Sequence, residues 1–143
     1  MKNKILWFDD QPQKITYYIN KLKQNGYRVQ IAKTYTEAEK ALGEEDEFQL
    51  MILDSLIPAV GIKEQQVYPG TGIKGGLTFF RVMKQKQLLD PSKVVVFTVS
   101  YEPNIYREFV ADGLPEEHYL IKEDYTTGMD FYYKVKELIE TFG

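Results

Sequence analysis

The sequence predicts an α/β fold in which a five-stranded parallel sheet carries helices on both faces. Short apolar segments alternate with segments of helical spacing about five times along the 143 residues, an order typical of parallel sheets with crossover helices. Several apolar segments run without interruption, as expected for strands covered on both sides. We find neither an internal repeat nor a linker, so we expect a single domain over residues 1–143.

The first half of the chain predicts three strands and two helices. An apolar run ends at two aspartates, and a proline then suits a helix start. Apolar residues recur at helical spacing up to an Asn-Gly pair, which is a helix stop signal. The predicted strands are Lys4–Phe8, Tyr27–Ala32 and Phe48–Leu53, and the predicted helices are Pro12–Gly26 and Thr36–Leu42, the second with a threonine cap candidate.

The second half predicts two strands and three helices after a long loop that covers about residues 55–74. Asp90-Pro91 breaks the first of these helices, and Gly113 stops the second. The three valines at 94–96 belong to the most strand-like segment of the chain. The predicted helices are Leu77–Leu88, Pro103–Ala111 and about Gly128–Phe142, and the predicted strands are Val94–Phe97 and His118–Ile121.

Composition narrows the function classes. The net charge is -3 and basic residues are spread among acidic ones, so we expect no nucleic-acid partner. The absence of cysteine excludes thiol chemistry and fits a cytoplasmic protein. The apolar start is too short for a signal peptide, and no stretch approaches the ~20 apolar residues of a membrane span. We therefore expect no membrane partner.

Polar side chains follow the predicted strands at their carboxyl ends, where ligands bind in open α/β sheets. Asp9 and Asp10 follow the first strand, and Asp54 follows the third. Thr98, with Ser100 beyond it, follows the fourth, and Lys122 follows the fifth. Any one of these residues could merely cap a helix or end a strand. Their occurrence at matching strand ends favours a common site.

The chemistry of this set points to phosphoryl transfer. Three clustered carboxylates repel one another and therefore favour a divalent cation. An oxygen-only site with few carboxylates suits Mg²⁺. A carboxylate can attack a phosphoryl group to form an acyl phosphate. Lys122 and Thr98 could bind the phosphoryl oxygens as charge builds up.

The sequence resembles the receiver domain of bacterial response regulators, of the kind that regulates chemotaxis in two-component signalling, over nearly its whole length. The residues that carry the resemblance agree with the family pattern in order and spacing. They are Asp9-Asp10, Leu53-Asp54, Pro58 four residues past that aspartate, Thr98, Lys122, and Tyr119 three residues before the lysine. The resemblance implies a flavodoxin-like doubly wound sheet with strand order 2-1-3-4-5.

The resemblance also implies roles. Asp54 would accept a phosphoryl group from a sensor histidine kinase or a phosphotransfer protein. Asp9, Asp10, Asp54 and the backbone carbonyl of Leu56 would hold Mg²⁺. Such a protein is a signalling acceptor rather than an enzyme, although it can catalyse its own phosphorylation and dephosphorylation.

A switch is implied as well. Thr98 would be drawn toward the phosphoryl group, and Tyr119 would turn inward as the aromatic partner. These changes would alter a surface made by the fourth helix, the fifth strand and the fifth helix. That surface would bind a downstream protein or a second copy of the chain.

Three features depart from the family pattern: Val99 after Thr98, Glu123 after Lys122, and the long loop after Asp54. They leave open a pseudo-receiver that only binds proteins. A phosphatase of the haloacid-dehalogenase type would need a second aspartate two residues past the nucleophile, where Leu56 stands. The loop contains a G-x-G-x-x-G match at 70–75, but it follows no strand directly, so we discount a nucleotide role.

Overall fold

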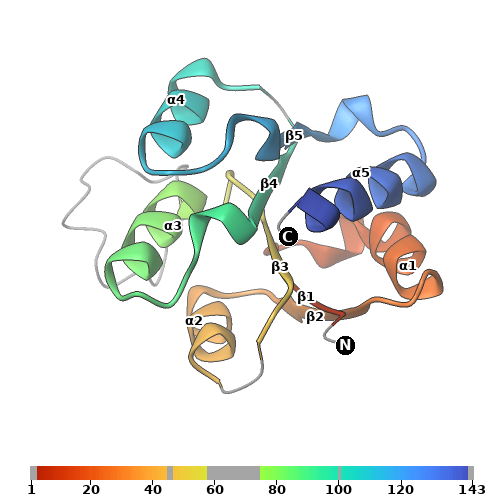
Figure 1. Ribbon diagram of the computed structural model, residues 1–143, viewed down its shortest axis with the longest axis horizontal. Coiled ribbons are helices and arrows are strands. Elements are labelled where there is room, and N and C mark those ends of the chain that lie inside the picture. The colour runs from red at the N-terminus through yellow and green to blue at the C-terminus, as the bar shows by residue number, and fades with distance from the viewer. Residues whose placement is uncertain (1–2, 45–46, 58–74, 100, 142–143) are drawn as a thin grey trace.

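The computed structural model describes residues 3–44, 47–57, 75–99 and 101–141. In these ranges five strands form one parallel sheet in the order β2-β1-β3-β4-β5 (Figure 1). The strands are β1 (Lys4–Phe8), β2 (Arg28–Ala32), β3 (Leu50–Leu53), β4 (Val94–Thr98) and β5 (Tyr119–Ile121). The predicted fold class and the flavodoxin-like strand order are confirmed.

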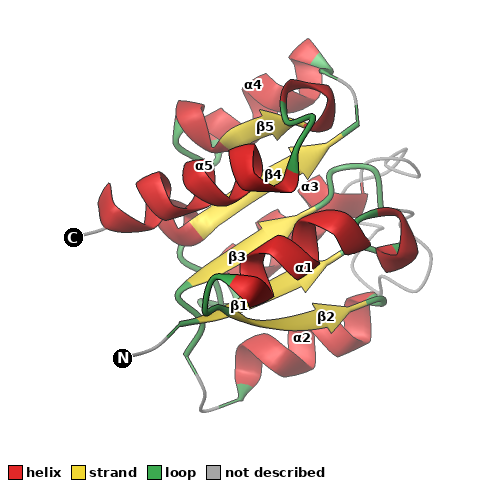
Figure 2. Ribbon diagram, turned by 90° about the vertical axis from the view of Figure 1, so that its right-hand side faces the viewer, coloured by secondary structure: helices red, strands yellow, loops and turns green. Residues whose placement is uncertain are grey.

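Within the same ranges five α-helices cover the sheet: α1 (Thr16–Gln24), α2 (Tyr35–Gly43), α3 (Gly75–Gln85), α4 (Pro103–Ala111) and α5 (Gly128–Thr141). Figure 2 shows α1 and α5 on the face toward the viewer, with α2, α3 and α4 behind the sheet. The sheet is therefore doubly wound, as predicted. No helix in the described part of the chain is both long and apolar enough to cross a membrane.

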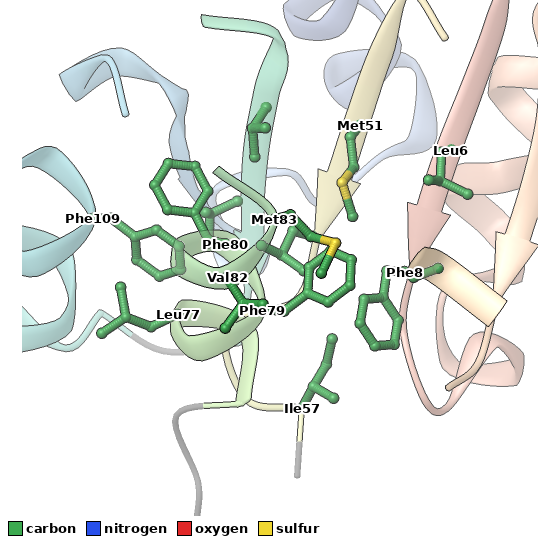
Figure 3. Packing of buried hydrophobic residues seen from close by; sticks show 14 of the residues in the cluster. Leu6, Phe8, Met51, Ile57, Leu77, Phe79, Phe80, Val82, Met83 and Phe109 are labelled. Atoms are coloured by element: carbon green, nitrogen blue, oxygen red, sulfur yellow. The ribbon is translucent and has the colours of Figure 1, made fainter. Parts of the chain in front are cut away.

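The sheet separates two hydrophobic cores because successive strand side chains point to opposite faces. On the α3 side, the rings of Phe8 and Phe79 lie 4.9 Å apart, within the cluster that Figure 3 shows. On the α1 and α5 side, Trp7 and Phe131 lie 5.5 Å apart, and Phe131 stacks on Phe97 at 4.3 Å. Each fully buried side chain of this size contributes about 1.5–3 kcal/mol, so the strand ends are held firmly.

Two predicted helices differ from the structure by more than one residue at an end. A 3-10 turn occupies Pro12–Lys14, and α1 begins only at Thr16. The helix predicted over Leu77–Leu88 is α3, which begins at Gly75 and ends at Gln85. It ends there because Gln87 takes a positive φ of 60°, a conformation that cannot continue an α-helix.

Three strands are shorter than predicted, and β4 is one residue longer because it includes Thr98. β2 begins at Arg28 rather than Tyr27. β3 begins at Leu50 rather than Phe48, and β5 begins at Tyr119 because His118 closes a 3-10 turn over Glu116–His118. The buried His118 ring makes a 2.8 Å hydrogen bond through Nδ1 with the carbonyl oxygen of Val94. This histidine therefore has a structural contact.

The N-terminus of α3 packs against the backbone that follows β3. A Cβ atom at Gly76 would lie 2.3 Å from the carbonyl oxygen of Asp54 and 2.8 Å from Cα of Ser55. Side chains do not tolerate approaches this close, so only glycine fits between the helix and this backbone. The helix thereby fixes the segment that carries Asp54.

We predict that Gly76→Ala destabilises the protein, because the added methyl group must push α3 away from Asp54 and Ser55. Overpacking of this kind costs about 1–3 kcal/mol of unfolding free energy, which urea unfolding would measure. Gly43→Ala is the control, since a Cβ there meets nothing within 4 Å and should leave stability unchanged or raise it by up to about 1 kcal/mol. Equal stability of Gly76→Ala and wild type would contradict the tight packing.

Candidate functional site

The carboxyl edge of the sheet carries a cleft of about 230 Å³, lined by Asp9, Asp10, Gln11, Lys14, Asp54, Leu56, Val99 and Lys122. These residues follow β1, β3, β4 and β5. The cleft therefore brings together the acidic residues and the lysine that the sequence assigned to one site.

The β1–β3 ladder sets the geometry of the acid cluster, which consists of Asp9, Asp10 and Asp54. Phe8 pairs with Leu53 in register, so the next residue on each strand is an aspartate. The Asp54 N–H donates to the Phe8 carbonyl at 3.2 Å, which extends the ladder to the acid itself. One ligand oxygen from each member of the cluster lies within 4.8 Å of the others.

Asp9 is 2% exposed, and its two oxygens differ. Oδ1 accepts a hydrogen bond from the Gln11 N–H at 2.8 Å. Oδ2 is buried without a hydrogen bond to any described residue, and the Lys122 Nζ lies 3.7 Å away from it. A buried carboxylate oxygen without a donor is costly, so this atom is suited to a cation.

Asp54 is 9% exposed and accepts a hydrogen bond from the Leu56 N–H at 3.0 Å. Burial raises the pKa of its carboxyl group, and the nearby charges of Asp9 and Asp10 raise it further. The Leu56 N–H and the Lys122 ammonium oppose this rise. The carboxylate form of Asp54 is thus disfavoured until positive charge enters the cleft.

Lys122 begins a 3-10 turn over Lys122–Asp124, which the Tyr125 N–H closes onto the Lys122 carbonyl at 3.0 Å. Its Nζ lies 5.6 Å from the centre of the Phe97 ring, an attractive cation–π arrangement. Glu123, where the family usually has proline, is exposed within the turn. The turn nevertheless directs the lysine into the cleft.

The acid cluster fits Mg²⁺. The donors are all oxygens, two of the three carboxylates are largely buried, and one oxygen lacks a hydrogen bond among the described residues. Mg²⁺ prefers such hard ligands and retains several waters. Leu56 lines the same cleft, and the role of its carbonyl stays a prediction. Pro58 and Ser100, which the sequence also singled out, lie outside the described residues.

Thr98 lies at the end of β4 but points elsewhere. It is fully buried and is not among the described residues that line the cleft. Its hydroxyl accepts a 2.8 Å hydrogen bond from Ser55, which is also fully buried. Sequence reasoning grouped Thr98 with the acids and missed Ser55. The sequence does contain a signal for Ser55, because it is a small hydroxyl residue directly after Asp54, at the end of a buried strand.

Tyr119 already lies inside the protein, at 9% exposure. Its ring packs against Tyr106 at 5.3 Å, Phe109 at 6.1 Å and Tyr101 at 6.2 Å between centroids. Its hydroxyl is buried beside the Ser55 hydroxyl and the Glu102 backbone. The ring is thus already inward in this structure, and the role of Tyr119 in switching stays a prediction.

Val99 is 57% exposed and stands at the mouth of the cleft. Its branched side chain lines the same cleft as Asp54. Whether it limits the access of a donor or an attacking water to the acid cluster stays a prediction.

Without metal, we predict that Asp54→Asn is more stable than wild type near neutral pH. Because the folded-state pKa lies above the unfolded value of about 3.9, wild-type stability falls as pH rises through the window between the two values. The variant lacks this loss. Urea unfolding across this range in EDTA, with the exposed Asp124→Asn exchange as control, measures the gap. A gap that is independent of pH would argue against a strained carboxylate.

Comparison with known proteins supports the fold. The sequence matches no protein-family model and no curated protein. A receiver domain protein (CheY-like) from Methanospirillum hungatei JF-1 is 20% identical, with a TM-score of 0.71 over 99% of this chain and 96% of that one. The beryllofluoride-activated NtrC4 receiver domain dimer is 22% identical, with a TM-score of 0.70 over 99% of both chains. Chemotaxis protein CheY4 of Vibrio cholerae is 19% identical, with a TM-score of 0.70 over 96% of this chain and 99% of that one. The chain therefore has the fold of CheY-like response-regulator receiver domains.

Proposed function

We propose that this chain is the phospho-acceptor receiver of a two-component system and that Asp54 takes the phosphoryl group. One observation carries the proposal: Asp54 ends a buried strand inside an acid cluster that Lys122 faces, in a cleft open to solvent. A carboxylate in this setting is desolvated, positioned by a backbone N–H, and directed at a space where a phosphoryl group fits.

The transfer step follows from the chemistry of acyl phosphates. With a phosphohistidine donor, an Asp54 oxygen bonds to phosphorus while the P–N bond breaks, and the imidazole keeps the electron pair and takes a proton from solvent. The donor is a sensor histidine kinase or a phosphotransfer protein. For the reverse signal, water attacks the phosphorus, inorganic phosphate leaves, and the Asp54 carboxylate is restored.

Each residue of the cleft has a task in this scheme. Asp9, Asp10, Asp54 and the Leu56 carbonyl would hold Mg²⁺, which when bound neutralises the charge of the phosphoryl oxygens. Lys122, held 3.7 Å from Asp9, supplies a second positive charge to those oxygens. The Leu56 N–H keeps one oxygen of Asp54 in place and so orients the other for attack.

The output surface comprises α4, β5 and α5. Phosphorylation adds roughly -1.5 to -2 charge and new acceptor oxygens beside β4 and β5. Tyr101, Tyr106 and Tyr119 form an aromatic group at this surface. We expect a downstream protein or a second copy of the chain to bind it, in the cytoplasm where kinase partners act.

We predict that acetyl phosphate with Mg²⁺ adds one phosphoryl mass to the protein and that Asp54→Asn abolishes the addition. Intact mass spectrometry measures this directly. Asp124→Asn, an exposed exchange of the same kind outside the cleft, should be labelled like wild type. Labelling that persists in Asp54→Asn would contradict the acceptor assignment, whereas no labelling of the wild type would favour a module that only binds proteins.

We also predict that Val99→Ala speeds both gain and loss of the phosphoryl group, because donor and water enter through the same mouth. A rise of roughly threefold corresponds to about 0.7 kcal/mol of barrier. Mass spectrometric time courses, with and without donor, give both rates. Val29→Ala, on the edge strand away from the cleft, is the matched control. Unchanged rates in Val99→Ala would show that Val99 does not limit access.

A further inference from the structure

Alternation along the strands places the key hydroxyls on one face of the sheet and the acids on the other. Val96 and Tyr119 belong to the core beneath α3 and α4, whereas Phe97 belongs to the core beneath α1 and α5. Thr98, two residues after Val96, shares the α3 and α4 side. Ser55 shares it as well, two residues after Leu53. Ser55 thus points away from the cleft that its neighbour Asp54 enters.

The Ser55–Thr98 hydrogen bond ties Thr98 to this side. The two hydroxyls lie 2.8 Å apart and both residues are fully buried, so no water competes for the bond. For the Thr98 hydroxyl to reach a phosphoryl group on Asp54, its side chain must rotate toward the cleft, and that rotation breaks the bond to Ser55. Without a new partner, Ser55 would then be a buried, unpaired hydroxyl, which is costly.

A new partner lies within reach of Ser55. The Tyr119 hydroxyl is buried beside the Ser55 hydroxyl and the Glu102 backbone. Burial raises the pKa of Tyr119, and hydrogen bonding with the Ser55 hydroxyl and the Glu102 backbone opposes this rise. A small rotation of either hydroxyl would therefore suffice to pair Tyr119 with Ser55.

The Ser55 backbone is itself held in place. Its Cα lies 2.8 Å from the position that a Cβ at Gly76 would take, so the first turn of α3 closes directly over it. One residue earlier, the Asp54 N–H donates a hydrogen bond to the Phe8 carbonyl of β1. The Ser55 backbone is thus held in place, whereas the side chains of Thr98 and Tyr119 beside it can rotate.

We propose that Ser55 is a positioning residue that exchanges hydrogen-bond partners, from Thr98 in the arrangement seen here to Tyr119 when Thr98 binds the phosphoryl group. The proposal rests on the proposed function of Asp54. The exchange keeps the buried hydroxyls paired, couples Thr98 to the aromatic surface, and requires no inward turn of the Tyr119 ring. It also makes Ser55 a competitor of the phosphoryl group for Thr98.

The competition has a measurable consequence. With Tyr119 present, Ser55→Ala removes one hydrogen bond from the free state and one from the bound state, so Mg²⁺-loaded protein should bind beryllofluoride, a phosphoryl mimic, with nearly the wild-type affinity. In a Tyr119→Phe background Ser55 has no new partner, so adding Ser55→Ala should tighten binding roughly three- to tenfold, the range expected for one neutral hydrogen bond. Fluorine NMR titration of wild type, both single variants and the double variant gives the coupling.

Thr78→Val is the matched control. The Thr78 hydroxyl is also buried on α3 and has no hydrogen bond to the described residues, and it is not bonded to Thr98. Its loss should leave beryllofluoride affinity unchanged.

A second measurement begins with the protein free of metal and mimic. Three-bond couplings should report a single χ1 rotamer for Thr98 in the wild type and averaging between rotamers in Ser55→Ala. Adding beryllofluoride to the wild type should shift the Tyr119 resonances, and that shift should shrink in Ser55→Ala.

The outcomes separate the two proposals. If the wild type binds beryllofluoride but Ser55→Ala has the same effect on affinity with Tyr119 and with Phe at that position, the exchange is wrong and the acceptor function stands. If Ser55→Ala does not tighten binding in the Tyr119→Phe background, Ser55 does not hold Thr98 back and the exchange is again wrong. If the wild type does not bind beryllofluoride at all, the acceptor function fails and the exchange fails with it.

Discussion

The register between β1 and β3 is the constraint on which the rest of the structure depends. Pairing Phe8 with Leu53 forces Asp9 and Asp54 to emerge side by side. At the 4.8 Å limit of the acid cluster, two carboxylates repel by roughly 3–4 kcal/mol at an effective dielectric constant of about 20. Two or three buried side chains of the central strands offset this at about 1.5–3 kcal/mol each. The apolar core therefore holds together charges that would otherwise separate, and the excess negative charge makes the cleft receptive to a cation.

Successive side chains of a strand point to opposite faces of the sheet, so neighbouring residues at a strand end can have different surroundings. Asp54 and Lys122 reach the cleft, whereas Ser55 and Thr98 sit beneath α3 and α4. Consecutive residues of one strand end, Asp54 and Ser55, thus point into the acidic cleft and toward the core beneath α3 and α4 respectively. Their separation is a consequence of backbone geometry, and a signal can cross the sheet through side-chain rotation without a large movement of the chain.

Sequence reasoning recovered the strands and the acid cluster because both follow from local pattern: apolar runs end at aspartates, and parallel strands end at one edge. It could not recover the contacts that depend on packing. Gly76 resembles any glycine near a helix start until its distance to the Asp54 carbonyl is known. The end of α3 depends on the positive φ of Gln87, and glutamine is not a residue type from which a positive φ can be predicted. The orientation of Thr98 was missed because its position at a strand end does not reveal that its hydroxyl bonds to Ser55.

The packing of α3 links these observations. Gly76 brings the helix onto the Asp54–Ser55 backbone, so the acceptor and the positioning hydroxyl are held by one contact. Under the proposed function a rigid backbone here would serve both roles, because an acid that accepts a phosphoryl group must be preorganised and a hydroxyl that exchanges partners must stay within reach of both. Movement is then confined to Thr98 and to the Tyr119 hydroxyl, which need only side-chain torsions. The proposed switch would therefore need only two side-chain rotations. A change of charge at Asp54 could then alter the α4–β5 surface without rearranging the loops between them.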